Sequence, residues 1–277
     1  MNILSWKNTT GLQLYAAEWP VEKPAAVIAF VHGQSEHIGR YDHVATWFNN
    51  HGIAFIGYDQ QGYGRSEGKR GHVSKLNLLL NDIGLMLEHA SAMYPGVPLF
   101  LYGHSMGGQL VLNYALRRKP AIAGLIATGP WIRLAFQPPA LKLLAAKILK
   151  NITPALTLPT ELAAHFLSRD EAVVRAYTND PLVHGQLSVV AGMELLDGAN
   201  WLDQYEGPVE MPLLLMHGGA DKLTSPEATK AFSERVKGRV EHKEWDDLYH
   251  EIHNEPEQEQ VFKYTLRWMN EVLNSSK

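Results

Sequence analysis

The chain alternates short, uniformly apolar runs with longer stretches in which apolar residues recur at a helical spacing. Five runs are typical of buried strands, because each is brief, lacks polar alternation and stops at Gly, His or Asp; they lie at 26–31, 53–58, 99–102, 124–128 and 213–217. Continuous apolar runs of this kind suit a parallel sheet that is covered on both faces.

The stretches between these runs are predicted to be helices. Residues 74–94 carry apolar side chains at a period close to 3.6, and residues 106–118 and 255–273 are similar. Residues 13–19 resemble an antiparallel edge strand, and residues 240–245 make a plausible last strand. Strands that alternate with helices favour an α/β sheet built from βαβ units.

The alternation stops between about residues 131 and 206. This segment contains a proline pair at 138–139, a helical stretch at 141–150 and further prolines. The simplest interpretation is a mostly helical cap, 131–206, inserted into a core formed by residues 1–130 and 207–277.

Composition narrows the function. Lys and Arg number 25 against 29 Asp and Glu, a net charge of −4, so no excess of positive charge exists for a nucleic-acid partner. Cysteine is absent, which excludes disulfides, thiolate nucleophiles and Cys-ligated metals. The N-terminus lacks the pattern of a signal peptide, and the longest apolar run, 25–31, is too short to span a bilayer. We therefore expect a cytoplasmic protein.

The segment 103–108, Gly-His-Ser-Met-Gly-Gly, lies between a predicted strand and a predicted helix. In that context Gly-x-Ser-x-Gly is the signature of a sharp turn that lifts a nucleophilic hydroxyl above the sheet. Ser105 is thus the predicted nucleophile. The alternative is a glycine-rich turn without chemistry.

A serine hydroxyl needs a base, and the base needs an acid to orient it. Asp221 follows the strand at 213–217 and His250 follows the last predicted strand, which gives the chain order Ser, Asp, His of α/β hydrolases. His253, Asp246 and Asp247 are rivals for these roles, and a lone exposed histidine is the alternative for His250.

The resulting oxyanion requires two backbone N–H donors. Met106 follows the nucleophile, and Gln34 lies in the loop after the strand at 26–31, so these are the predicted donors. The run 250–253 is one residue short of a His-Glu-x-x-His zinc motif, and residues 62–68 lack the glycine of a dinucleotide fingerprint. We therefore expect neither a metal nor an organic cofactor.

These residues resemble the α/β-hydrolase superfamily, and more narrowly its monoacylglycerol lipase and lysophospholipase branch. The resemblance covers nearly the whole chain and is weakest in the cap; its markers are 32–41, 62–68, 103–108, 219–221 and 249–253. It implies an α/β-hydrolase fold, with a mostly parallel central sheet, helices on both faces and an inserted helical cap. Tyr63 departs from the pattern, since the family often has His there.

The resemblance also implies a polar pocket for the glycerol part of a substrate, and places Glu36, Arg40 and His253 in it. A hydroxyl-rich group needs such donors and acceptors, whereas an acyl chain does not. The alternative is that Glu36 and Arg40 form a structural ion pair that fixes their loop.

The helical stretch at 141–150 has an apolar face that includes Leu141, Leu144 and Ile148, with its lysines away from that face. The face suits an acyl tunnel or transient peripheral contact with a membrane, and the alternative is packing on the core.

The sequence thus predicts a serine ester hydrolase that cleaves monoacylglycerols to fatty acid and glycerol through an acyl-enzyme. A lysophospholipase or a broad-specificity carboxylesterase is the alternative within this class. A non-catalytic ligand-binding protein of the same fold is the alternative outside it. A peptidase is less favoured, because no visible feature selects an N-terminal amine.

Overall fold

A computed structural model of the protein describes residues 1–160 and 163–275. One eight-stranded sheet runs through it in the order β1-β2-β4-β3-β5-β6-β9-β10. The strands of this sheet are β1 (Asn2–Lys7), β2 (Gln13–Trp19), β3 (Ala26–Val31), β4 (Ile53–Tyr58), β5 (Leu99–His104), β6 (Gly124–Thr128), β9 (Pro208–Gly218) and β10 (Lys237–Trp245). β2 pairs antiparallel with β1 and β4, and the other pairs are parallel. The predicted fold class is therefore confirmed.

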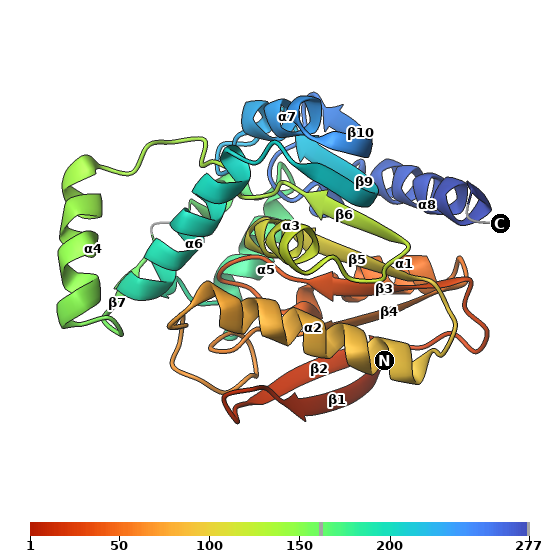
Figure 1. The fold of residues 1–277 in the computed structure, drawn as a ribbon, viewed down its shortest axis with the longest axis horizontal. Helices are drawn as coiled ribbons and strands as arrows, with labels where there is room; N and C mark the ends of the chain where they lie inside the picture. Colours follow the sequence, from red (N-terminus) through yellow and green to blue (C-terminus); the bar gives the residue numbers. More distant parts are fainter. Residues whose placement is uncertain (161–162, 276–277) are drawn as a thin grey trace.

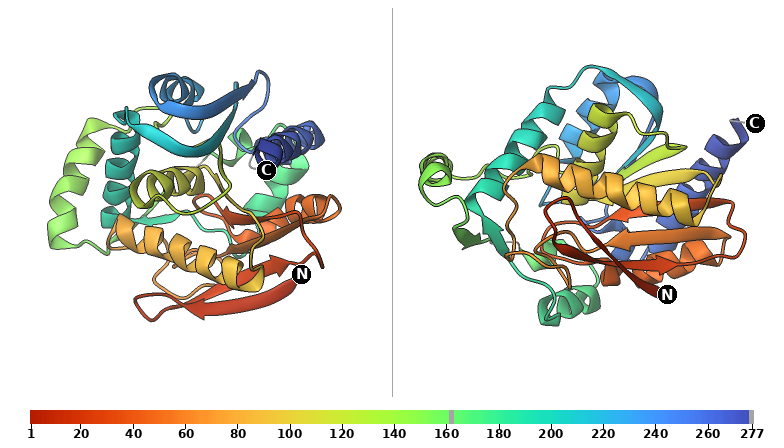
Figure 2. Two further views of the ribbon diagram at one scale, coloured as in Figure 1. Left: turned by 45° about the vertical axis from the view of Figure 1, so that its right-hand side comes forward. Right: turned by 60° about the horizontal axis from the view of Figure 1, so that its bottom comes forward.

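Helices cover both faces of the sheet, as Figures 1 and 2 show. On one face α2 (Leu76–Met93), α3 (Met106–Arg118) and α7 (Pro226–Arg235) bury their apolar side chains. On the other face α1 (Asp42–Asn49) and α8 (Gln258–Ser275) do the same. Side chains of β3 alternate between these two cores, so every residue of the strand is buried. This double burial explains why the inner strands are continuous apolar runs.

β1 was not predicted from the sequence. Its residues alternate between exposed and partly buried, and among them only Trp6 is fully buried. The strand lies at the edge of the sheet, paired with β2 alone. An edge strand of this kind carries no continuous apolar run, and so the signal that identified the inner strands is missing.

The segment between β6 and β9 contains α4 (Ala140–Ile152), β7 (Thr157–Pro159), α5 (Glu171–Asn179), β8 (Gln186–Ser188) and α6 (Val189–Asp203), together with the short 3-10 helix η2 (Ala164–Phe166). α4 stands at the edge of the molecule, and α6 lies between it and α3 (Figure 1). The division of the chain into a core and a cap at residues 131–206 stays a prediction.

α6 is attached to α3 by side-chain amides. Gln109 donates from Nε2 to the Leu195 carbonyl at 2.5 Å, and Asn113 donates from Nδ2 to the Gly198 carbonyl at 3.3 Å. Gln109 and Asn113 are fully buried on α3, while α6 contributes buried apolar residues to the core beside them. Hydrogen bonds buried in this way are costly to break, because each partner would be left unsatisfied.

The start of α3 approaches β3 very closely. A Cβ atom at Gly107 would lie only 2.1 Å from the carbonyl oxygen of Val31, and one at Gly103 would lie 2.3 Å from the carbonyl oxygen of Gly107. Glycine is therefore required at both positions for the strand-to-helix turn to form.

We predict that Gly107→Ala strongly destabilises the protein, by about 3 kcal/mol or more, because backbone atoms must move to admit the methyl group. Gly192→Ala is the matched control: its Cβ would meet Leu187 at an ordinary 3.4 Å inside α6. There the better helix propensity of alanine stabilises by about 0.5–1 kcal/mol. Urea unfolding of both variants checks this, and a Gly107→Ala midpoint equal to that of the wild type contradicts it.

Candidate active site

Ser105 is the single residue between β5 and α3. Its backbone has φ 55° and ψ −116°, which is a strained conformation for a residue with a side chain. The strain is held in place by hydrogen bonds, since Ser105 N–H donates to the Thr128 carbonyl at 2.9 Å and the Ser105 carbonyl accepts from Trp131 N–H at 3.1 Å. The side chain is half-buried and therefore within reach of a substrate.

His250 lies against this hydroxyl. Its Nε2 is 2.8 Å from Ser105 Oγ, and its Nδ1 is 2.7 Å from Asp221 Oδ2. With the Asp221 carboxylate as acceptor, Nδ1 carries the proton and Nε2 is free to accept from the serine. The structure thus brings Ser105, His250 and Asp221 together in one hydrogen-bonded line, although they are far apart in the sequence.

Asp221 lies in the turn after β9, and its carboxylate is fully buried. Oδ1 accepts from the backbone N–H groups of Leu223 at 2.7 Å and Thr224 at 3.1 Å. Burial alone would raise the pKa of Asp221, but His250 and a hydrogen bond from His217 hold this pKa well below its usual range. The carboxylate is therefore ionised at neutral pH.

The electrostatics of His250 favour its charged form. Burial acts to lower the pKa of this histidine, but Asp221, Glu251 and Glu36 together outweigh burial and raise the pKa above its ordinary value. A base with a raised pKa accepts the serine proton more readily, and its cationic form is stabilised where it is generated.

The loop after β3 lies directly beside Ser105, the predicted nucleophile. A Cβ at Gly33 would be 3.2 Å from the Cβ of Ser105, so the backbone at Gly33 and the half-buried Gln34 border the reacting centre. Met106 opens α3, and its N–H is one of those that a helix leaves without an intrahelical partner. The two predicted oxyanion donors thus belong to segments that lie next to Ser105: Gln34 to the loop after β3 and Met106 to the start of α3.

His32 holds this loop in place, a role that was not predicted from the sequence. Burial lowers the pKa of His32 to about 4, so the ring is neutral. Its Nε2 lies 2.9 Å from Gln60 N–H and its Nδ1 lies 2.7 Å from the Gly33 carbonyl. Nε2 therefore accepts and Nδ1 donates, and both contacts hold the backbone that leads to Gln34.

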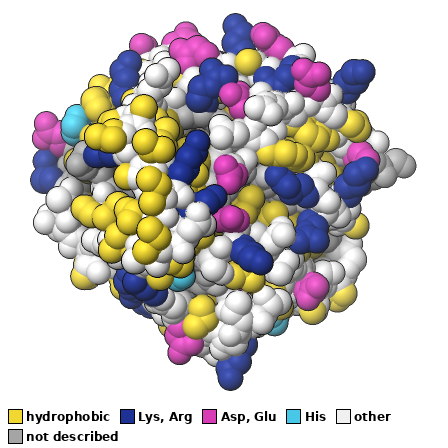
Figure 3. All heavy atoms as spheres, turned by 60° about the vertical axis from the view of Figure 1, so that its left-hand side comes forward, with side chains coloured by type: hydrophobic (Ala, Val, Ile, Leu, Met, Phe, Trp, Pro, Cys, Tyr) yellow, Lys and Arg dark blue, Asp and Glu magenta, His cyan; other side chains and the backbone are white. Residues whose placement is uncertain are grey.

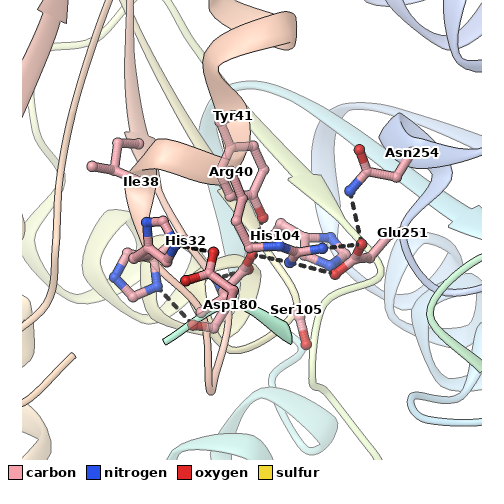
Figure 4. Close-up of polar contacts among 12 residues, drawn as sticks. His32, Ile38, Arg40, Tyr41, His104, Ser105, Asp180, Glu251 and Asn254 are labelled. Atoms are coloured by element: carbon pink, nitrogen blue, oxygen red, sulfur yellow. Dashed lines mark hydrogen bonds and ion pairs between the residues drawn. The ribbon is translucent and has the colours of Figure 1, made fainter. Parts of the chain in front are cut away.

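A buried ion-pair network joins this loop to the loop that bears His250 (Figure 4). Arg40 lies 2.6 Å from Glu36 through Nη1, and both of its Nη atoms lie 2.7 Å from the carboxylate oxygens of Glu251. Glu36 also accepts from Gly33 N–H at 2.5 Å and from the Tyr41 hydroxyl at 2.7 Å. The ion pair that was the alternative interpretation of Glu36 and Arg40 is thus formed, and Glu251 is an added partner that the sequence did not reveal.

Glycerol contacts for Glu36, Arg40 and His253 stay a prediction. His253 is buried, with its ring stacked on Tyr41 at 4.9 Å between centroids. Burial lowers the pKa of His253 to about 3, so the ring is neutral. Among the described residues its Nε2 has no hydrogen-bond partner, whereas Arg40 is shared between two carboxylates.

The predicted acyl-binding side chains lie on the outer surface of the cap. The exposed fractions are 77% for Leu141, 56% for Leu144 and 55% for Ile148, and no residue of α4 is buried. These three side chains therefore do not pack on the core, whereas Leu143 and Leu149 of the same helix are half-buried and α4 contacts α6. A role in lining an acyl tunnel stays a prediction. Within residues 1–160 and 163–275, no cluster of His, Cys, Asp or Glu that could hold a metal is present.

Comparison with known proteins identifies the family of the chain. The profile of the family described as "Serine aminopeptidase, S33" matches residues 22–257. The chain is 32% identical to a monoacylglycerol lipase of Mycolicibacterium smegmatis over 96% of this chain and 95% of that protein. It is 33% identical to phospholipase YtpA of Bacillus subtilis, over 92% of this chain and 99% of that protein.

A solved structure supports the same α/β-hydrolase fold. The monoacylglycerol lipase of Paleococcus ferrophilus superposes with a TM-score of 0.86 and 32% identity, covering 94% of this chain and 99% of that one. The chain also matches an uncharacterized abhydrolase domain-containing protein of Dictyostelium discoideum at 37% identity, but spans only 29% of its length.

We predict that kcat/KM for a soluble, uncharged ester falls on the acidic side with a midpoint above pH 6.5, the ordinary histidine value. The reason is that protonated His250 cannot accept the serine proton, and its pKa is raised in the folded protein. Near-ultraviolet circular dichroism over the same range controls for unfolding. A midpoint at or below pH 6.5 in the folded protein is the contrary result.

Proposed function

Because this chain belongs to the α/β-hydrolase family described as serine aminopeptidase, S33, and is an ester hydrolase, we propose that it cleaves monoacylglycerols to a fatty acid and glycerol. The hydrogen-bonded line from Ser105 through His250 to Asp221 carries the proposal. Relatives named monoacylglycerol lipase, similar over nearly the whole chain, support the substrate class.

In the proposed mechanism, Ser105 Oγ attacks the ester carbonyl while His250 Nε2 takes its proton. The oxyanion that forms accepts hydrogen bonds from the N–H groups of Gln34 and Met106. The imidazolium then protonates the glycerol oxygen as the C–O bond breaks, which leaves an acyl-enzyme. A water molecule, deprotonated by His250, attacks this ester and releases the fatty acid, and Asp221 stabilises the imidazolium in both halves.

The apolar cavity that borders Met106 is too small in this structure to hold an acyl chain. This cavity, lined by residues such as Val73, Leu187 and Leu195, measures about 10 Å³, enough for roughly one water molecule. Leu187 lies in β8 and Leu195 lies in α6. We therefore propose that these elements or their neighbours in the cap shift when a lipid binds.

The cap also supports a membrane contact. Figure 3 shows hydrophobic side chains gathered on the face to which α4 belongs. Leu141, Leu144, Ile148 and Ile152 are all more than half exposed there. Among the described residues, no helix is long and apolar enough to cross a bilayer. We propose that this face, which we call the α4 face, rests on a lipid surface from which the substrate enters.

For the polar end of the substrate, we propose a position near Glu36, Arg40 and His253. The unpartnered Nε2 of His253 favours this histidine as the direct contact. Glu36 and Arg40 are engaged with each other and with Glu251, so they would act by holding the surrounding loops in place.

A lysophospholipase is the second candidate, because the chain is similar to phospholipase YtpA over nearly its full length. A panel of 1-monoacylglycerols of several chain lengths, lysophosphatidylcholine and a short-chain p-nitrophenyl ester separates the candidates. We predict the highest kcat/KM on a monoacylglycerol, and abolition of all turnover in Ser105→Ala, since the hydroxyl that forms the acyl-enzyme is gone.

Fluorophosphonate labelling of the wild type, absent in Ser105→Ala, is the control that links turnover to this serine. Preference for lysophosphatidylcholine would replace the proposed substrate, and substantial turnover by Ser105→Ala would refute the assigned nucleophile.

We also predict that the double variant Leu144→Ser, Ile148→Ser binds phosphatidylcholine vesicles at least tenfold more weakly, because roughly 0.8 kcal/mol is lost per methylene withdrawn from the lipid and about two such groups already account for a tenfold change. Its kcat/KM on a soluble short-chain ester stays at the wild-type value. Ile3→Ser is the matched control, since Ile3 is 68% exposed on β1, away from α4. Equal vesicle sedimentation by the wild type and the double variant would contradict the proposed contact.

A further inference from the structure

Asp221 accepts hydrogen bonds from two histidines. Besides His250, the ring of His217 approaches the same carboxylate oxygen, with Nε2 at 3.0 Å from Oδ2. His217 is the penultimate residue of β9, and both its side chain and that of Asp221 are fully buried. His217 therefore has no access to substrate or solvent, and its effect on the reaction passes through Asp221 or through the Thr224 hydroxyl, which lies 3.2 Å from His217 Nε2 and 3.3 Å from His250 Nδ1.

The hydrogen bonds around His217 define where its proton is. An ionised carboxylate is only an acceptor, so Nε2 must carry a hydrogen to bond Asp221. On the other side of the ring, Nδ1 lies 2.8 Å from the hydroxyl of Thr229, on α7. In the neutral ring Nδ1 accepts from this hydroxyl, and the Thr229 side chain thereby favours the tautomer that Asp221 requires.

Thr224 does not replace this donor. Its hydroxyl lies 2.8 Å from Asp221 Oδ2 and 3.0 Å from the Gly129 carbonyl, and both of these atoms are acceptors. One hydroxyl has one hydrogen to share between them. Thus His217, besides the base itself, directs an N–H at Oδ2; the Thr224 hydroxyl oxygen is a second acceptor near Nε2, but it lies farther away, at 3.2 Å against 3.0 Å for Oδ2.

We propose that His217 is a positioning residue for the acid of the site: its Nε2–H fixes the orientation of the Asp221 carboxylate and competes with His250 for Oδ2. This inference rests on the proposed function, in which Asp221 is the acid. Two consequences follow. The carboxylate cannot rotate away from His250, and its pull on the His250 proton is weaker than that of a carboxylate with a single histidine partner.

Other charged and titratable groups in the described part of the chain act on the two histidines. Near His217 these include Glu227 on α7 and His242 on β10. Near His250 they include His104, Glu36, Glu251 and His253. The experiment leaves all of these groups in place, so any change in the titration of His250 is traced to the change at His217.

Two variants of similar side-chain size separate a hydrogen-bond donor from a space-filling residue. His217→Gln retains an N–H at about the position of Nε2, and His217→Met retains only volume. We expect His217→Met to lower kcat/KM on a soluble ester about tenfold, the effect of one hydrogen bond to a charged group. We also expect the acidic limb of its pH profile to move upward by roughly half a pH unit, because Asp221 then attracts the His250 proton more strongly.

His217→Gln should recover most of both changes. Rates are divided by the fraction of enzyme that a fluorophosphonate labels, so that loss of folded protein does not count as loss of rate. A purely structural role would lower the melting temperature of both variants and leave the acidic limb in place. The inference is overturned if the acidic limb of the pH profile does not move in His217→Met. It is also overturned if His217→Met and His217→Gln have equal kcat/KM and equal pH profiles.

A measurement on the wild type keeps the inference testable even if His217→Met does not fold. In ¹⁵N-histidine spectra near pH 7, with His217 assigned by its absence from His217→Gln, Nε2 should be protonated. A ring without a proton on Nε2 overturns the inference. Asp221→Asn tests separately the premise that Asp221 is the acid of the site. If this variant leaves turnover unchanged, the proposed function fails. If it abolishes turnover while the acidic limb of the His217→Met pH profile stays in place, only the inference about His217 fails.

Discussion

The close approach of α3 to β3 is the constraint on which the site depends. Because Gly107 lies against the Val31 carbonyl, the turn from β5 to α3 is forced to be sharp, and Ser105 takes a positive φ. This turn points the hydroxyl out of the sheet toward His250 and sets the first N–H groups of α3 beside it. The backbone strain at Ser105 is sustained by the surrounding sheet, in which every neighbouring strand is buried on both faces.

Charge is arranged around this turn in two buried groups. Asp221 and its two histidines lie on one side, and Arg40 with Glu36 and Glu251 lies on the other. The second group fixes the loops that carry Gln34 and His250 relative to each other, since Glu36 and Glu251 belong to those loops. Both groups are fully hydrogen-bonded at their carboxylates, as buried charges must be for the structure to tolerate them.

The inner strands and the residues Ser105, Asp221 and His250 could be identified from the sequence, because their signals are local. A strand buried on both faces is a continuous apolar run, and Ser105 and Asp221 follow such runs, whereas His250 follows the half-buried edge strand β10. His217, His32 and Glu251 gave no such signal. Their roles arise from contacts between loops that are distant in the sequence. A histidine at the end of a strand that positions another residue looks the same in the sequence as one that does not. The exposure of α4 was equally hidden, since an amphipathic pattern identifies an apolar face but not what covers it.

The amide contacts of Gln109 and Asn113 attach α6 to α3, whereas α4, the other long helix of the predicted cap, has no fully buried residue. Swinging α6 away from α3 would strip buried carbonyls of their donors, whereas the side chains of α4 that its displacement would uncover, such as Leu143 and Leu149, are only half-buried. An entrance for a long hydrocarbon therefore opens at lower cost by hinging the outer helix than by lifting the whole insert. Any shift of α6 that the proposed acyl site requires would thus cost more than a shift of α4, so that the outer helix would move first and α6 only as far as its amide contacts with α3 allow.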